Sequence, residues 1–368
     1  MKQVLVACDS FKGSLTSAEI TRIAVDVFRP FQNIKLVVTP FADGGEGSLD
    51  CVASVTDGVV QQVVVPNLFG QLQSVCYIIS DNHAFIEVAS VCGMHHLAPQ
   101  QLNPCQASSQ GVGYLIRHAV ECGCSSITLF LGGTATIDGG TGMLRSLGVE
   151  FMDCCGTPIS SGNPLLSFAK ICWGNVMNRL QGIHFDIVCD VVNPIMGPMG
   201  GVKIFGPQKG LQYVDVEKFE HRLCEWLQQL EKHTDAQVKN LETEPFGGAA
   251  GGIGLPFLGR SNTSFHIGFE WFRQKLKLDL LIRNSDLVIT GEGRIDHQTH
   301  MGKGVGRIAQ LCRSLGKPVV GICGSTDGSS QLFNQIFILG DGLLPYDESM
   351  NKASQLFAGE LLKIATLP

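Results

Sequence analysis

Acidic residues directly after short apolar runs form the clearest chemical pattern in the sequence. They are Asp9, Asp43, Glu46, Asp190, Glu292 and Asp296, and a seventh acid, Asp138, lies within a glycine-rich segment. Carboxylate oxygens are the ligands that Mg²⁺ prefers, and they can accept a proton from a reacting hydroxyl. Glycines beside them let backbone N–H groups approach an anion closely. A single Gly-Asp pair is an ordinary turn, but the seven acids fall into five motifs, because Asp43 goes with Glu46 and Glu292 with Asp296. Five such motifs in one chain favour a site for a Mg–nucleotide and for phosphoryl transfer.

Basic residues in glycine-containing loops would supply the positive charge that such a site needs. They are Lys12, Lys209, Arg294 and Lys303. Only 16% of the residues are charged, so a basic residue in a glycine-containing loop is less ordinary here than in most proteins. Each of these side chains suits contact with an anion and a solvated loop position equally well. The segment 247–254 carries no chemical group of its own. It suits a close helix crossing and a backbone anion nest equally well.

Several functional classes are excluded by motifs that the chain lacks. Gly302-Lys303 is followed by Gly304 and does not complete a P-loop, and no G-x-G-x-x-G or G-x-S-x-G sequence occurs. The fourteen cysteines include no C-x-x-C pair, and the histidine pairs lack the companions of a metal site. The formal net charge is -6 with no basic run, which argues against nucleic acid as a partner. No apolar stretch reaches membrane-spanning length and no signal peptide is evident, so we expect a cytoplasmic protein with no membrane partner.

The elements that must position these residues alternate between strand and helix. The expected strands are 3–8, 35–40, 74–79, 83–88, 126–131, 185–189, 287–290, 317–323 and 335–339, and the expected helices are 16–31, one from Ser48, 110–121, 143–147, 216–232 and 353–364. Asp81-Asn82 is a plausible hairpin turn between the third and fourth strands. This alternation predicts an α/β protein with a mainly parallel sheet covered on both faces. The change to hairpin-like strands after about residue 60 predicts a discontinuous domain of residues 1–65 and 285–368, into which a second α/β domain of residues 66–284 is inserted.

The motifs in their order along the chain resemble the bacterial glycerate kinases, the glycerate kinase type-1 family. The resemblance rests on the following segments: Asp9–Leu15 (DSFKGSL), Ala42–Gly47 (ADGGEG), Gly132–Gly142, Cys189–Val191 with Asn193-Pro194, Phe205–Gly210, Ala249–Gly252, and Val288–Asp296 (VITGEGRID) with Gln298-Thr299 and Gly302-Lys303. It covers essentially the whole chain. It implies an ATP-dependent, Mg²⁺-requiring phosphotransferase that converts D-glycerate to phosphoglycerate, 2-phosphoglycerate being favoured over 3-phosphoglycerate. It also implies two α/β domains, one of them flavodoxin-like, with the active site in the cleft between them, and we expect a monomer or a homodimer.

Site roles follow from the chemistry of these motifs. We expect Asp190 to be the catalytic base, with Lys209 and Arg294 as further catalytic residues and Asp43, Glu46 and Glu292 as metal ligands. The residues expected to bind substrate or phosphate are Asp9, Ser10, Lys12, Ser14, Gly44, Gly45, Gly132, Gly133, Thr134, Asp138, Asn193, Gly291, Asp296 and Lys303.

The chain departs from the family pattern at a few positions. Ile137 replaces the usual asparagine and Val192 the usual aspartate, Cys8 stands for a proline, and Phe246 interrupts a glycine-rich stretch. The first two changes leave two alternatives open. One is a paralogue that binds a sugar acid or a nucleotide without transferring phosphate, and the other is a kinase for a related hydroxy acid such as tartronate or erythronate.

Overall fold

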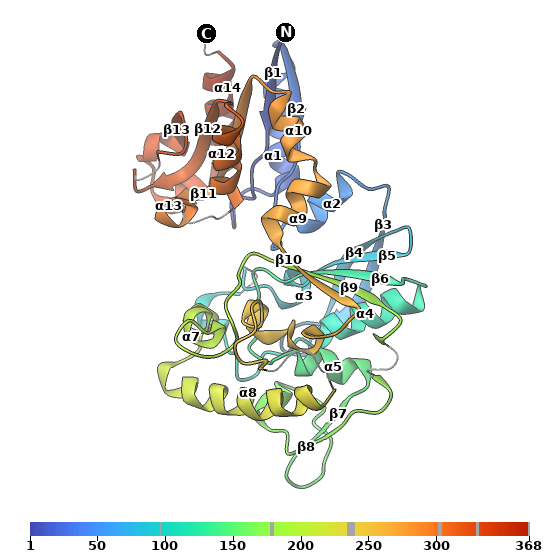
Figure 1. Cartoon of the computed structure of the whole chain (residues 1–368). Helices are drawn as coiled ribbons and strands as arrows, with labels where there is room; N and C mark the ends of the chain where they lie inside the picture. Colours follow the sequence, from blue (N-terminus) through green and yellow to red (C-terminus); the bar gives the residue numbers. More distant parts are fainter. Residues whose placement is uncertain (96, 177–179, 234–239, 301–303, 329–330, 367–368) are drawn as a thin grey trace. The chain divides into compact units, whose positions relative to one another are not determined.

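The computed structural model describes residues 1–95, 97–176, 180–233, 240–300, 304–328 and 331–366 (Figure 1). The chain divides into two compact units. The first contains Met1–Asp43, Asp50–Thr56 and Gly268–Pro368, and the second contains Gly44–Leu49 and Asp57–Ile267. The fold is therefore α/β, with one unit built from both ends of the chain and the other from its middle. No helix in the described part of the chain is long and apolar enough to cross a membrane.

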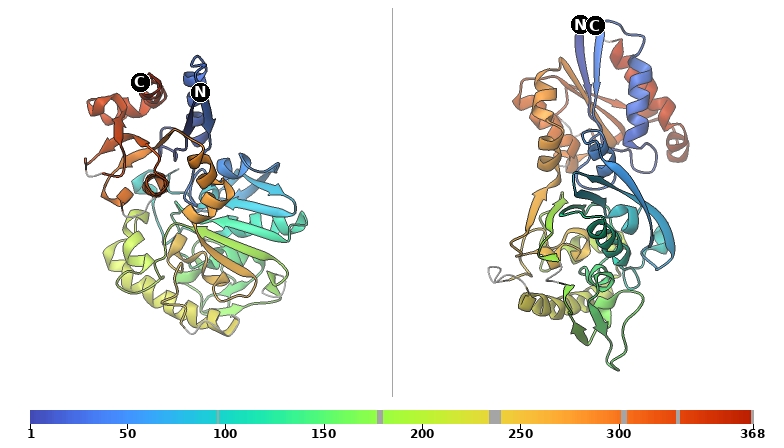
Figure 2. Two further views of the ribbon diagram at one scale, coloured as in Figure 1. Left: turned by 45° about the horizontal axis from the view of Figure 1, so that its top comes forward. Right: turned by 90° about the vertical axis from the view of Figure 1, so that its right-hand side faces the viewer.

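The first unit is built on a five-stranded parallel sheet. Its strands, in spatial order, are β13 (Gln335–Ile338), β12 (Val319–Thr326), β11 (Leu287–Ile295), β1 (Lys2–Val6) and β2 (Ile34–Val38). Its helices are α1 (Ser17–Phe28), α9 (Gly268–Lys275), α10 (Leu278–Arg283), α11 (His297–His300), α12 (Gly304–Ser314), α13 (Tyr346–Asn351), α14 (Ala353–Ala365) and the 3-10 turn η8 (Leu339–Gly342), and the division between the units falls within α2 (Ser48–Ala53). Helices α1 and α14 cover one face of the sheet, and α9, α10 and α12 lie on the other, as the right-hand view of Figure 2 shows.

The beginning of α1 follows from its capping residues. The Thr16 side chain accepts a hydrogen bond from the backbone N–H of Glu19, and the Glu19 carboxylate accepts one from the backbone N–H of Thr16. This reciprocal pair is a capping box. It confirms the expected start of the helix, while Pro30 ends the helix before the expected residue 31 because proline cannot continue it.

One strand of this sheet is longer than the sequence predicted. We expected β11 to end at Thr290 and the following residues to form a loop, but the strand continues to Ile295. Its neighbour β12 also continues, so that Arg294 pairs with Ser325 and Ile295 with Thr326. The expected loop was wrong because residues of β12 provide backbone partners that local sequence does not reveal. As a result, Glu292 and Arg294 project from a strand.

The second unit contains a six-stranded mixed sheet. Its spatial order is β10 (Thr263–Ile267), β9 (His184–Cys189), β6 (Ser126–Phe130), β5 (His83–Glu87), β4 (Leu72–Ser80) and β3 (Val59–Pro66). The first four strands are parallel, and β4 and β3 are antiparallel additions at the edge. The expected hairpin between β4 and β5 is confirmed, with Asp81 and Asn82 both at positive φ, as a two-residue turn of this kind requires. Strand β3 was not predicted.

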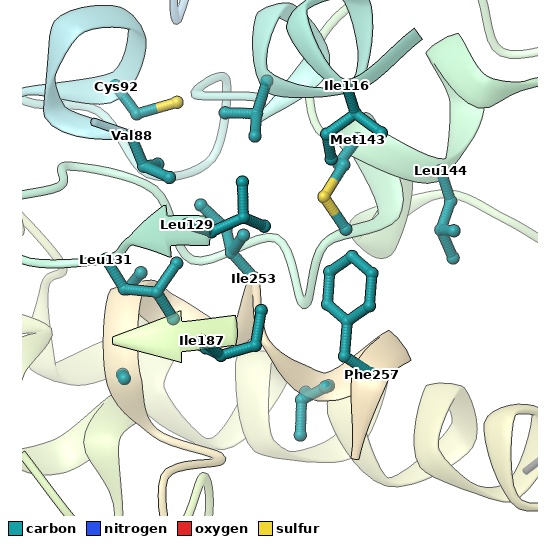
Figure 3. Close-up of a cluster of buried hydrophobic side chains, with 14 of the residues drawn as sticks. Val88, Cys92, Ile116, Leu129, Leu131, Met143, Leu144, Ile187, Ile253 and Phe257 are labelled. Atoms are coloured by element: carbon teal, nitrogen blue, oxygen red, sulfur yellow. The ribbon is translucent and has the colours of Figure 1, made fainter. Parts of the chain in front are cut away.

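Helices and 3-10 turns complete the second unit. They are α3 (Ala89–Cys92), α4 (Gln110–Glu121), α5 (Thr141–Leu147), α7 (Gly201–Phe205), α8 (Val216–Leu230), η1 (Pro99–Gln101), η2 (Pro164–Leu166), η3 (Pro207–Lys209), η4 (Tyr213–Asp215), η5 (Glu231–His233), η6 (Ala249–Gly252) and η7 (Leu255–Phe257), with a small hairpin of β7 (Glu150–Met152) and β8 (Lys170–Cys172). Figure 3 shows part of the core, in which Leu129 of β6 and Ile187 of β9 lie among side chains of α4, α5 and η7.

Candidate functional site

The order of strands in the first unit brings three of the predicted acids to one edge. The chain passes from β1 to β2 on one side, and from β11 through β12 to β13 on the other, so the sheet order reverses between β1 and β11. Ligands of open α/β sheets bind at the carboxyl ends of the strands at such a point. Asp9 follows β1, Asp43 follows β2 and Glu292 lies near the end of β11. All three side chains line one pocket of ≈ 990 Å³.

Asp9 occupies the centre of this acidic group. Burial raises the pKa of its carboxyl well above the usual range, and repulsion from Asp43 and, more weakly, Glu292 raises it further. The positive charge of Lys12 and a hydrogen bond from the backbone N–H of Ser10, at 2.7 Å from Asp9 Oδ1, partly oppose the shift. The pocket therefore concentrates negative charge that a cation would stabilise.

The loop that carries Lys12 is a tight turn anchored at both ends. Phe11 and Leu15 are buried, and each backbone N–H donates to the carbonyl oxygen of the other. The Phe11 ring packs edge-on against Phe357 of α14, at 5.5 Å between ring centroids. Gly13 has a positive φ of 78°, which lets the turn close while Lys12 stays exposed. Two buried apolar residues thus hold an exposed ammonium group at the pocket.

A threonine that was not among the predicted site residues links the acids of β11. The Thr299 hydroxyl donates to Glu292 Oε1 at 2.7 Å and accepts from the backbone N–H of Asp296 at 3.1 Å. Arg294, whose side chain is largely exposed, pairs with Asp296, with 3.2 Å between Nε and Oδ2. Gln298-Thr299 was noticed only as part of a longer family motif, and no spacing rule marks a threonine as a carboxylate partner.

The pocket of the first unit also brings together other candidate residues. Ser10, Ser14 and Asp296 line the pocket beside Lys12 and Arg294. Gly291 does not line it, but a Cβ there would lie 2.4 Å from the carbonyl oxygen of Ile322, so this position of β11 accepts no side chain. Lys303 lies outside the described residues.

The acidic residues suit a magnesium ion that is also bound by phosphate better than a metal ion held by protein side chains alone. Within the described ranges, no three His, Cys, Asp or Glu side chains gather as a metal-binding group. Mg²⁺ is usually held through one or two carboxylates together with substrate phosphates and water. Asp43 and Glu292, on either side of Asp9, offer that number of carboxylates. The residues present are therefore compatible with Mg²⁺ brought in with a phosphate ligand.

In the second unit, Asp138 is enclosed by donors of its own chain. Its Oδ2 accepts from the backbone N–H and hydroxyl of Ser109, both at 2.7 Å, and from the backbone N–H of Gly142. Its Oδ1 accepts from the backbone N–H of Gly140. Burial raises the pKa of this carboxyl, while these four hydrogen bonds oppose the shift. Asp138 thus anchors the segment between β6 and α5. Ser109 was not among the predicted site residues.

Lys209 is buried in the same unit, although the sequence placed it in a loop. Its Nζ donates to the backbone oxygen of Thr136 at 3.0 Å and to the Thr134 hydroxyl at 3.3 Å. Burial lowers the pKa of this ammonium group to about 8, and attraction to Cys92 and Asp138 opposes the change only in part. The lysine therefore fixes the Thr134–Thr136 backbone from inside.

Glycines allow the loops of the second unit to touch backbone to backbone. A Cβ at Gly132 would lie 2.6 Å from Gly45 Cα, and the Gly132 N–H donates to the Gly44 oxygen. A Cβ at Gly251 would lie 2.0 Å from the Thr136 oxygen, and one at Gly248 would lie 2.4 Å from the Pro194 oxygen. Close packing is therefore what the 247–254 segment provides; no anion is needed to explain its glycines.

The other predicted residues of the second unit have separate surroundings. Asp190 directly follows β9, at the carboxyl end of the parallel strands. The Asn193 side chain donates to the Met199 backbone oxygen at 2.8 Å and closes the following turn. Glu46 Oε2 lies 3.6 Å from His95 Nδ1. Gly133 is exposed, with a positive φ of 77°.

Comparisons with known proteins agree along the whole chain. The family model of the Glycerate kinase family matches residues 4–367. The chain belongs to the glycerate kinase family. A glycerate kinase of Halalkalibacterium halodurans is 32% identical over 100% of this chain and 98% of its own length. A glycerate 2-kinase of Escherichia coli K12 is 34% identical over 88% of this chain and 85% of its own.

A solved structure extends the comparison to the fold. The crystal structure of a candidate glycerate kinase 2 from Salmonella typhimurium LT2 has a TM-score of 0.78 and 32% identity, covering 99% of this chain and 97% of the other. As a member of this family, the chain is a phosphotransferase with an alcohol group as acceptor.

The structure places the departures from the family pattern in different environments. Ile137 is 1% exposed and belongs to the main core of the second unit, whereas Val192 is 52% exposed. Cys8 is buried in the core of the first unit. Phe246 has a positive φ of 70°, which a glycine would adopt without strain, and its ring stacks on Phe265 at 5.6 Å.

Replacing Gly251 with alanine should destabilise the protein by about 2–3 kcal/mol, because the added methyl group overlaps the Thr136 oxygen and must displace packed backbone. Urea unfolding measures the change. Gly174→Ala is the matched control, since Gly174 also has a positive φ, of 55°, and the nearest atom to its added carbon, the Gly148 oxygen, is 3.8 Å away. Equal stability of the two variants would contradict the close-packing role.

Lys209→Met should change the pH dependence of stability. Folding lowers the pKa of Lys209 to about 8 from an unfolded value of about 10.4, so between these values the unfolded chain binds more protons and the free energy of unfolding rises with pH. The variant lacks this rise, so the wild type should gain about 2 kcal/mol relative to it between about pH 8 and pH 10. Urea unfolding at several pH values, with the partly exposed Lys203→Met as control, measures this difference; a constant difference would contradict the assignment.

Proposed function

We propose that this chain is an ATP-dependent glycerate kinase that phosphorylates D-glycerate with the help of Mg²⁺, giving 2-phosphoglycerate. The observation that carries the proposal is the family match from residue 4 to residue 367, because it includes every loop that bears a candidate site residue. The pocket of the first unit supports it chemically. A phosphate chain needs cations beside it, and Lys12 and Arg294 line this pocket together with carboxylates suited to Mg²⁺.

Within the pocket we assign roles by charge. Lys12 and Arg294 would bind phosphate or the carboxylate of glycerate, and Ser10 and Ser14 would add hydroxyl groups. Asp43 and Glu292 would hold Mg²⁺, which when bound offsets charge on the transferring phosphoryl group. Glu46 remains a candidate ligand from the second unit, where it lies beside His95.

We assign Asp190 as the general base that takes up the proton of the glycerate hydroxyl. The hydroxyl oxygen of glycerate attacks the γ-phosphorus in line, the bond to the bridging oxygen of ADP breaks, and the Asp190 carboxylate takes up the proton. Its place directly after a parallel strand supports this role, since the strand holds the residue at a fixed position. Most of the rate enhancement would come from positioning and charge stabilisation.

Lys209 and Asp138 would act by positioning. Lys209 donates to Thr134 and Thr136, and Asp138 accepts from Ser109, Gly140 and Gly142. Both hold the Gly132–Gly142 segment, whose exposed Gly133 offers backbone for contact with phosphate. This is a narrower role for Lys209 than direct catalysis.

The purified protein should release ADP from ATP only when D-glycerate is present. A coupled assay for ADP, run with D-glycerate, tartronate and erythronate, separates the kinase from its alternatives. A protein that only binds its ligands gives no acid-dependent ADP, and a kinase for a related acid prefers another substrate. Phosphorus NMR of the product distinguishes 2-phosphoglycerate, the expected product, from 3-phosphoglycerate.

Asp190→Asn should reduce kcat by about 10²–10⁴-fold, the usual contribution of a general base, and leave KM for glycerate nearly unchanged. Asp186→Asn is the matched control on the preceding strand β9, because the Asp186 carboxylate accepts from His266 and has no assigned catalytic role. Near-normal turnover of Asp190→Asn would rule out the base.

A further inference from the structure

The pocket of the first unit changes its chemistry along the edge of the sheet. The strand order β13-β12-β11-β1-β2 arranges its lining residues in sequence. Ile338 ends β13 and Leu339 follows it; farther along the chain the apolar Leu344, Met350 and Ala353 line the pocket together with the polar Asp341 and Ser349. At β12 the lining residues are Gly324, Ser325 and Thr326, and the charged lining residues apart from Asp341 lie in or just after β11, β1 and β2. One end of the pocket is therefore largely apolar, the middle carries hydroxyl groups, and the other end carries most of the acids and both lining cations of the described residues.

We propose that the apolar end holds the base of the nucleotide that donates the phosphoryl group, with the ribose over β12 and the phosphates at Lys12 and Arg294. This inference rests on the proposed kinase function and names the part of the pocket that the function leaves without a ligand. The base is a flat, largely apolar ring, and apolar side chains line most cofactor pockets with a few polar groups to fix orientation.

The size of the pocket supports a nucleotide. Its volume of ≈ 990 Å³ lies at the upper end of the range of about 300–1,000 Å³ that is typical of ligand sites, far more than a three-carbon acid can fill. Neighbouring strands lie about 4.8 Å apart, so the distance along the edge from β13 to β1 is roughly 14 Å. That span suits an extended nucleoside triphosphate.

Charge fixes the direction in which the nucleotide lies. Among the lining residues that the structure describes, both cations, Lys12 and Arg294, are at the charged end. At the apolar end the lining includes an acid, Asp341, which pairs with Lys363 at 3.4 Å. Phosphate groups placed at this end would lose their hydration, and the apolar side chains would compensate little for that loss. Glycerate is equally unsuited to the apolar end, because its carboxylate and hydroxyl groups would be buried against leucine side chains.

The local backbone is shaped to present these apolar side chains. Gly340, Asp341 and Gly342 all have positive φ, which turns the chain sharply after Leu339. A Cβ at Gly340 would lie 2.9 Å from Leu344 Cδ1, so the absent side chain leaves room for Leu344 to fold back. Met350 Cε lies 3.2 Å from the point where Gly13 would carry a Cβ. Met350 therefore lies against the turn that bears Lys12.

Leu344→Asp tests the inference, with its exposed neighbour Leu343→Asp as the matched control, since Leu343 is 85% exposed and does not line the pocket. Leu344→Asp should raise KM for ATP and Kd for ADP by about tenfold or more, the loss expected when one leucine contact is removed, and leave kcat and KM for glycerate within about twofold. Leu343→Asp should behave as wild type. Met350→Ser, a second lining variant, should also raise Kd for ADP, and circular dichroism checks that each variant is folded.

Binding titrations separate this inference from the proposed function. Calorimetry with ADP and with inorganic tripolyphosphate should show that Leu344→Asp weakens ADP alone, because tripolyphosphate has no base. If the wild type forms no ADP with any acid but binds ADP with the expected sensitivity, the kinase proposal fails and the base site stands. If folded Leu344→Asp and Met350→Ser both bind ADP as wild type does, or raise KM for glycerate instead, the base site is overturned.

Discussion

Repulsion among carboxylates at neighbouring strand ends is the constraint on which the candidate site depends. A parallel sheet whose order reverses between β1 and β11 brings Asp9, Asp43 and Glu292 to one edge. Burial is the main cause of the raised pKa of Asp9, and repulsion from Asp43 and Glu292 raises it further. A fold built for stability alone would separate such groups, since like charges at short range cost free energy. Lys12, on an anchored turn, offsets part of this cost, and a bound cation would offset more.

The second unit solves a different problem, which is to hold loops in fixed shapes without filling the space around them. Because Gly132, Gly248 and Gly251 have no side chains, their backbones pack directly against the backbone of other segments. A side chain at any of these positions would clash. Forty-four glycines in 368 residues exceed the usual share of about 7%. These contacts show what part of the excess does: it sets the spacing between loops.

The parts of the structure that the sequence predicts are those whose causes are local. The start of α1, set by Thr16 and Glu19, and the hairpin turn at Asp81-Asn82 each depend on a few neighbouring residues, and both agree with the predicted helix and hairpin. The end of β11 depends on a partner strand 31 residues away, and the burial of Lys209 depends on Thr134 and Thr136, more than 70 residues away. Strand-end acids could be placed because every parallel strand ends at the same edge. Thr299 and Ser109 could not, because a hydroxyl that orients a carboxylate carries no pattern in sequence.

The two units differ in how they use charge, and the difference separates binding groups from positioning groups. In the first unit Lys12 and Arg294 remain exposed beside a pocket, so a ligand can compete for them. In the second, Asp138 and Lys209 are buried and engaged by hydroxyl and backbone groups of the chain itself. A buried charge that already has its partners gains little from a ligand, but removing it leaves those partners unsatisfied. The charge of such a residue therefore preserves the shape of a loop. Among the charged residues in glycine-rich motifs, the exposed ones are the better candidates for ligand contacts.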